Sequence, residues 1–244
     1  MNDLKYFKHL VPVLTPGQSQ GADAKTIVEP FCGSCAMTLT LFADHTKYKY
    51  HFNDLDPHLF AVVSDVNGYL KFKADVIQMY NDFNRDHSGE STDRHPNLAK
   101  LWKSTVQSID SPFTNFYVNE KFIRSALFKI SKDNPDMNHV AIFEKATKTH
   151  EDYKIVMEQY RWDEDAFIFL DPPYLFSDNS GYYPQNEDSD MTDIIVYILD
   201  CFTSCPCKVM LIIKDLKILR YLFRDHIKGD YMRTYQLGTK RRST

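Results

Sequence analysis

Short apolar runs alternate with stretches of helical hydrophobic spacing along the 244 residues of the chain. Apolar runs bounded by turn-forming residues are typical of buried strands, whereas apolar positions three and four apart predict helices. By these patterns we expect strands at 26–28, 48–53, 167–170, 209–213 and 231–237, and helices at 34–43, 190–202 and 216–227. This order of elements predicts an α/β fold, in which a mostly parallel sheet carries helices on both faces.

The stretch from 66 to 138 does not follow this alternation. Its pattern is helical throughout, with polar breaks at 87–91 and 108–112. We therefore interpret 66–138 as a helical insertion, which is carried on a core formed by residues 1–65 and 139–244.

The composition is typical of a soluble, intracellular protein. Hydrophobic residues make up 43% of the chain, yet no stretch is long and apolar enough to span a membrane, and the N-terminus lacks a signal-peptide layout. Five cysteines without regular spacing argue against a disulfide scaffold. Cys32 and Cys35 form a C-x-x-C pair, for which zinc is an alternative. No histidine stands at ligand spacing beside them, so we expect buried thiols and no metal.

The formal net charge is −4, and the charged residues are distributed unevenly along the chain. Residues 151–200 contain thirteen Asp or Glu and two Lys or Arg, whereas residues 206–244 contain ten Lys or Arg and three Asp. Within the basic region, Lys240, Arg241 and Arg242 are candidates for contact with phosphates. A charge run of this kind is also typical of a solvated surface, so both interpretations stay open.

Two motifs follow the first two predicted strands. Residues 29–34 read Glu-Pro-Phe-Cys-Gly-Ser and open a predicted helix. A turn of small residues lets the backbone approach a ligand, and a helix N-terminus offers free N–H groups. Asp54 ends the second strand, where a carboxylate can accept hydrogen bonds from ribose hydroxyls. Asp56 and Pro57 have the residue types of a helix start, so we expect Asp56 to be an N-cap.

The most specific motif is Asp171-Pro172-Pro173-Tyr174, directly after the predicted strand 167–170. Two prolines remove two backbone N–H donors and stiffen the chain. The Asp171 carboxylate and the Pro172 carbonyl are both acceptors, so together they can hold the two N–H hydrogens of an amine. Tyr174 adds an aromatic face for a planar base. An ordinary proline turn is the alternative.

In their order along the chain, these motifs and the helical insertion resemble the Dam-like DNA adenine methyltransferases. The resemblance covers nearly the whole chain and implies a Rossmann-like fold of the S-adenosylmethionine-dependent methyltransferase type. It also implies that the insertion recognises the target and that 235–242 matches a C-terminal hairpin. For the cofactor it implies binding by Glu29, Phe31, Gly33 and Ser34, with the ribose held by Asp54 and the adenine by Asp152.

The reaction implied is methylation of the exocyclic amine of adenine in DNA, with S-adenosylmethionine as the methyl donor. The catalytic residues are then Asp171, Pro172, Pro173 and Tyr174. The base must leave the stack, and Phe176, Tyr182 and Tyr183 are candidates to close over it, with ordinary packing of the loop as the alternative. Lys240, Arg241 and Arg242 are expected to bind the DNA.

Other functions remain open from the sequence. One alternative keeps the same chemistry and takes a cytosine amine or a base in RNA as the methyl acceptor. A second alternative belongs to a different class: a weakly active or silent subunit with the methyltransferase fold that binds nucleic acid or a protein partner. Association with a protein partner or with a second copy of the chain is also left open.

Overall fold

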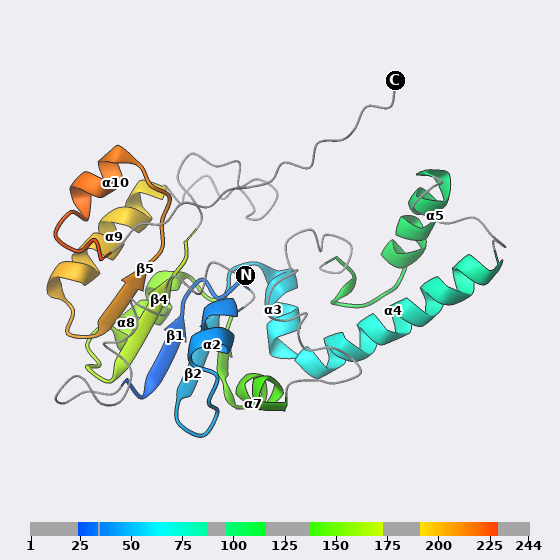
Figure 1. Ribbon diagram of the computed structural model, residues 1–244, viewed down its shortest axis with the longest axis horizontal. Helices are drawn as coiled ribbons and strands as arrows, with labels where there is room; N and C mark the ends of the chain where they lie inside the picture. Colours follow the sequence, from blue (N-terminus) through cyan, green and yellow to red (C-terminus); the bar gives the residue numbers. More distant parts are fainter. Residues whose placement is uncertain (1–23, 34, 87–95, 116–136, 173–190, 229–244) are drawn as a thin grey trace.

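The computed structural model describes residues 24–33, 35–86, 96–115, 137–172 and 191–228 (Figure 1). In these residues, five parallel strands form one sheet in the order β3-β2-β1-β4-β5. The strands are β1 (Thr26–Glu29), β2 (Lys49–Asn53), β3 (Thr147–Thr149), β4 (Ala166–Leu170) and β5 (Lys208–Leu211). The chain is therefore an α/β protein, and its sheet is compatible with a Rossmann-like fold.

Eight helices are present in the same described ranges. They are α2 (Ala36–Leu41), α3 (Pro57–Ser64), α4 (Val66–Asp86), α5 (Pro96–Gln107), α7 (Met137–Lys145), α8 (Tyr153–Tyr160), α9 (Met191–Ser204) and α10 (Lys217–Leu222). Figure 1 shows α9 and α10 beside β5, whereas α4 and α5 extend away from the sheet on the other side. None of the helices in the described residues is long and apolar enough to cross a membrane.

The sheet separates two hydrophobic cores, because neighbouring residues of a strand point to opposite faces. Ile27 and Phe167 belong to one core, together with residues of α2, α3, α4 and α7. Val28 and Ile168 belong to the other core, together with residues of α8, α9 and α10. Helices therefore cover both faces of the sheet, as the sequence predicted.

The order of the strands determines where a ligand can bind. From β1, the chain moves to β2 and β3 on one side, and β4 and β5 lie on the other side. In open parallel sheets, ligands bind outside the carboxyl ends of the strands at the point where this order reverses. That point lies between β1 and β4, which are directly paired.

Most of the elements expected from the sequence are present where the structure describes the chain. Two helices are shorter than predicted: α2 spans only Ala36–Leu41 of the expected 34–43, and α10 ends at Leu222 and not at Ile227. Phe223 leaves the helical geometry (φ −99°, ψ 13°) and is buried in the core, and His226 then donates a backbone hydrogen bond to Phe223 at 2.8 Å in a turn. The strand expected at 231–237 lies outside the described residues.

The insertion proposed for 66–138 stays an interpretation, but its described part is helical in α4 and α5. The first turn of α4 is joined to the core, because Val66 and Tyr69 are buried with residues of the sheet. Further along, Tyr80 and Phe83 of α4 contact the ring of Trp102 of α5, with ring centroids 5.1 and 5.5 Å apart.

Candidate functional site

Acidic side chains stand at the carboxyl ends of three neighbouring strands. Glu29 is the last residue of β1, Asp54 directly follows β2, and Asp171 directly follows β4. Because β1 pairs with both β2 and β4, the three residues share one edge of the sheet. Asp171 is close enough to Glu29 for its charge to raise the Glu29 pKa. Three of the residues predicted from separate motifs are thus gathered at the point where the strand order reverses.

Glu29 is buried and attached to the helix that follows it. Its side chain is 1% exposed, and its carboxylate accepts the Thr38 N–H at 3.0 Å. Cys35, at the N-cap of α2, offers no side-chain cap, so Glu29 satisfies a free amide of the first helical turn from the end of β1. Burial raises the Glu29 pKa to about 7, the hydrogen bond from the Thr38 N–H opposes this rise, and the charge of Asp171 adds to it.

Asp54 connects the end of β2 to the loop between β1 and α2. One carboxylate oxygen accepts the Gly33 N–H at 2.9 Å, and the other accepts the Asp56 N–H at 3.0 Å. The side chain is 4% exposed, and burial raises its pKa to about 6. Asp56 caps α3 by accepting the N–H groups of His58 and Leu59, which confirms the prediction that it starts a helix.

The loop between β1 and α2 contains two residues in left-handed backbone geometry. Gly33 and Cys35 have φ values of 49° and 51°, in the left-handed region that favours glycine. Apart from its chain neighbours, no atom of the described residues lies within 4 Å of the position that a Cβ would occupy on Gly33, so these residues leave the space beside its backbone open. Cys35 donates a hydrogen bond to the Cys32 carbonyl at 2.7 Å, which closes the turn.

The two buried carboxyl groups suit a ligand with positive charge. Neither Glu29 nor Asp54 forms an ion pair with a lysine or arginine in the part of the chain that the structure describes. Burial without such a partner disfavours the ionised form, and this is the main cause of both raised pKa values. A cation bound beside these groups would offset that penalty.

Asn53 was not identified as a site residue from the sequence, yet its side chain has the largest set of hydrogen bonds here. Its amide nitrogen donates to the carbonyls of Pro30 and Glu151, both at 2.9 Å. Its amide oxygen accepts the Thr149 hydroxyl at 2.8 Å and the Glu151 N–H at 2.9 Å. The only signal in the sequence was an amide side chain immediately before Asp54.

The segment predicted to contact the cofactor adenine lies at the end of the neighbouring strand. Asp152 caps α8 by accepting the Lys154 N–H at 2.8 Å, so the structure gives it the role of a helix N-cap, and its contact with the cofactor stays a prediction. The next residue, Tyr153, stacks on Phe31 with ring centroids 5.0 Å apart. Phe31, another predicted cofactor residue, is therefore held against α8.

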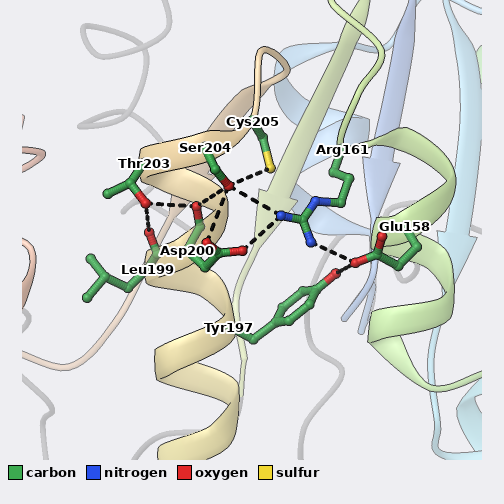
Figure 2. A network of polar contacts seen from close by, with 8 residues as sticks. All are labelled: Glu158, Arg161, Tyr197, Leu199, Asp200, Thr203, Ser204 and Cys205. Carbon is green, nitrogen blue, oxygen red and sulfur yellow. Dashed lines mark hydrogen bonds and ion pairs between the residues drawn. The ribbon is translucent and has the colours of Figure 1, made fainter.

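Helix α8 is in turn fastened to α9 by a polar network (Figure 2). Arg161, just after α8, donates to Glu158 at 2.7 Å and to Asp200 of α9 at 2.8 Å. The Tyr197 hydroxyl donates to Glu158 at 2.6 Å, and the Tyr197 ring packs edge-on against Tyr153. These contacts connect the aromatic pair beside the site to the helix layer on one face of the sheet.

Other predicted residues are placed in part or not at all. Pro172 is buried beside the exposed Asp171 at the end of β4. The remaining predicted residues lie outside the described ranges: Ser34, Pro173, Tyr174, Phe176, Tyr182, Tyr183, Lys240, Arg241 and Arg242. All five thiols are free, and four of them are buried. Comparison with protein-family models and with curated proteins finds no match.

Proposed function

We propose that this protein is an S-adenosylmethionine-dependent methyltransferase that methylates the exocyclic amine of adenine in DNA. The observation that carries the proposal is the meeting of Glu29, Asp54 and Asp171 at one edge of a parallel sheet, with Glu29 and Asp54 buried. S-Adenosylmethionine carries a positively charged sulfonium group, which acidic side chains attract. The Asp-Pro-Pro-Tyr motif that begins at Asp171 supports an amine as the methyl acceptor.

Four of the expected cofactor residues have positions consistent with binding S-adenosylmethionine. Asp54 has two carboxylate oxygens that each accept one backbone N–H, which leaves lone pairs free for ribose hydroxyls. The open side of Gly33 leaves room for the cofactor beside the loop. Phe31 belongs to the β1–α2 loop and Asp152 precedes α8, and these two segments meet where Phe31 stacks on Tyr153. The donated group is a methyl bound to sulfonium sulfur.

For the reaction, Asp171 and the Pro172 carbonyl accept the two N–H hydrogens of the target amine. The nitrogen lone pair is then less delocalised into the ring and can attack the methyl carbon. Bound S-adenosylmethionine would supply the methyl group from its sulfonium and leave as the neutral thioether, and the methylated nitrogen would release one proton to solvent. Tyr174 stacks on the extruded base. Alignment and fixed charges supply most of the rate in this mechanism.

Calorimetric titration with S-adenosylmethionine tests the cofactor part of the proposal. The parent should bind with one site per chain, and Asp54→Ala should bind more weakly. Glu164→Gln, which alters an exposed acid between α8 and β4, is a matched control and should bind like the parent. If the parent gives no binding heat at several temperatures, the cofactor assignment is wrong, and the alternative of a silent binding subunit gains support.

A further inference from the structure

Asn53 ends β2 with a side chain that is 1% exposed and fully used in hydrogen bonding. A carboxamide has two donor hydrogens and an oxygen that accepts two bonds. Here both donors point at carbonyl oxygens, of Pro30 and Glu151, and the oxygen receives the Thr149 hydroxyl and the Glu151 N–H. The orientation of the amide is therefore fixed, because the reversed group would place donors against donors.

These contacts join two segments that are far apart in the sequence. Pro30 belongs to the loop after β1, and Glu151 lies between β3 and α8. The backbone of Asn53 adds a further contact to the first loop, because its carbonyl accepts the Cys32 N–H at 2.8 Å. One residue of β2 thus holds the loop with Gly33 and the segment with Asp152 at a defined separation.

The side chain must also be neutral to do this. An aspartate at position 53 would have the same shape, but it would place an acceptor against the carbonyls of Pro30 and Glu151. It would also add a third carboxylate beside Glu29 and Asp54, which burial already disfavours in their ionised forms. Only an amide supplies donors to one pair of partners and an acceptor to the other.

We propose that Asn53 is a positioning residue for the cofactor site: it sets the distance between the β1–α2 loop and the start of α8. The part of this proposal that concerns the cofactor rests on the proposed function. Asn53 touches no reacting group. Its loss therefore weakens S-adenosylmethionine binding and loosens the β1–α2 loop and the start of α8. The same loss leaves the rate at saturating cofactor nearly unchanged.

The test compares Asn53→Ala and Asn53→Asp with Tyr50→Phe. Tyr50 is a matched control, because it is a buried residue of the same strand whose hydroxyl bonds the Phe42 and Asp44 carbonyls at the opposite end of β2. Hydrogen–deuterium exchange reports on the two segments without any ligand. Calorimetry and steady-state kinetics then report on the cofactor.

We expect Asn53→Ala to speed amide exchange at Cys32 and Glu151 by about ten-fold or more, and to raise the S-adenosylmethionine Kd and KM by about the same factor. The kcat should stay within about three-fold of the parent. Asn53→Asp keeps the acceptor for the Glu151 N–H, so exchange at Glu151 should rise less than in the alanine variant. Tyr50→Phe should speed exchange at Asp44, whose N–H donates to the Tyr50 hydroxyl at 3.2 Å.

Two results would overturn the proposal. Unchanged exchange at Cys32 and Glu151 in Asn53→Ala would show that other contacts hold the segments. Faster exchange with parent-like cofactor affinity would show that their separation does not matter for binding. If Asn53→Ala does not fold, the comparison is made with Asn53→Asp. If the parent binds no S-adenosylmethionine, the proposed function fails, and the exchange rates still decide whether Asn53 holds the two segments.

Discussion

Replacing Glu29 with glutamine removes the most deeply buried acid of the site and nearly preserves its shape. Glutamine retains an oxygen that can accept the Thr38 N–H, which the carboxylate accepts at 3.0 Å. Burial raises the Glu29 pKa from 4.5 to about 7. A raised carboxyl pKa contributes stability that is fully present below the unfolded value and is lost as the pH rises through the folded value. The window for Glu29 therefore extends from about pH 4.5 to about pH 7.

The size of this effect follows from the two pKa values. With a pKa of 4.5 in the unfolded state and about 7 in the folded state, Glu29 lowers the free energy of unfolding by about 1 kcal/mol at pH 5.5 and by about 3 kcal/mol at pH 8, relative to strong acid. The difference, about 2 kcal/mol, is the part of the parent's pH dependence between these two conditions that belongs to Glu29. Glu29→Gln should lack it.

Urea unfolding of the parent and of Glu29→Gln at about pH 5.5 and pH 8 measures this difference directly. Asp54 also has a pKa raised by burial, to about 6, but it is present in both proteins and drops out of the comparison. Glu164→Gln, which removes an exposed acid, should behave like the parent. If Glu29→Gln retains the parent's pH dependence, Glu29 ionises as an ordinary surface acid, and the argument for a site that favours a cation loses its basis.

Three further predictions concern binding and chemistry. Asp54→Ala should weaken S-adenosylmethionine binding by about 1.5–3 kcal/mol in calorimetry, because a charged hydrogen-bond acceptor is lost. An affinity equal to the parent's would show that Asp54 has only a structural role. Asp171→Asn should reduce single-turnover methylation of DNA by about a hundred- to thousand-fold, while cofactor affinity and Tm stay near the parent's. A large fall in Tm would instead show that Asp171 stabilises the fold. Replacing Lys240, Arg241 and Arg242 together with alanine should flatten the salt dependence of DNA binding by about two to three units of slope, and an unchanged slope would leave these residues to solvent.

The central strands could be predicted from the sequence because consecutive apolar residues indicate a buried strand. Strand β4, with the sequence Ala-Phe-Ile-Phe-Leu, is buried at every position. Strand β3 could not be found in this way, because it is three residues long, reads Thr-Lys-Thr and has no apolar run. It exists because His51, Phe52 and Asn53 of β2 offer backbone partners to it. This pairing of β3 with β2 can be seen only in the folded sheet.

The acids of the site could be predicted from their positions at strand ends, but the contacts that hold them could not. Glu29 caps a helix that begins seven residues later, in place of a cap that Cys35 does not supply. Asn53 bonds Glu151, which is 98 residues away in the sequence. Such contacts depend on the order of the strands in space, and no local pattern encodes that order.

The most direct test of the central claim is the transfer of a tritium-labelled methyl group from S-adenosylmethionine to unmethylated DNA, followed by digestion and separation of the nucleosides. The account predicts that the parent protein places label in N6-methyladenine, that duplexes of guanine and cytosine alone remain unlabelled, and that Asp171→Asn leaves adenine-containing DNA nearly unlabelled. Label in another base, or unlabelled DNA despite saturating cofactor binding and a wide choice of sequences, would contradict the claim that this site methylates the adenine amine.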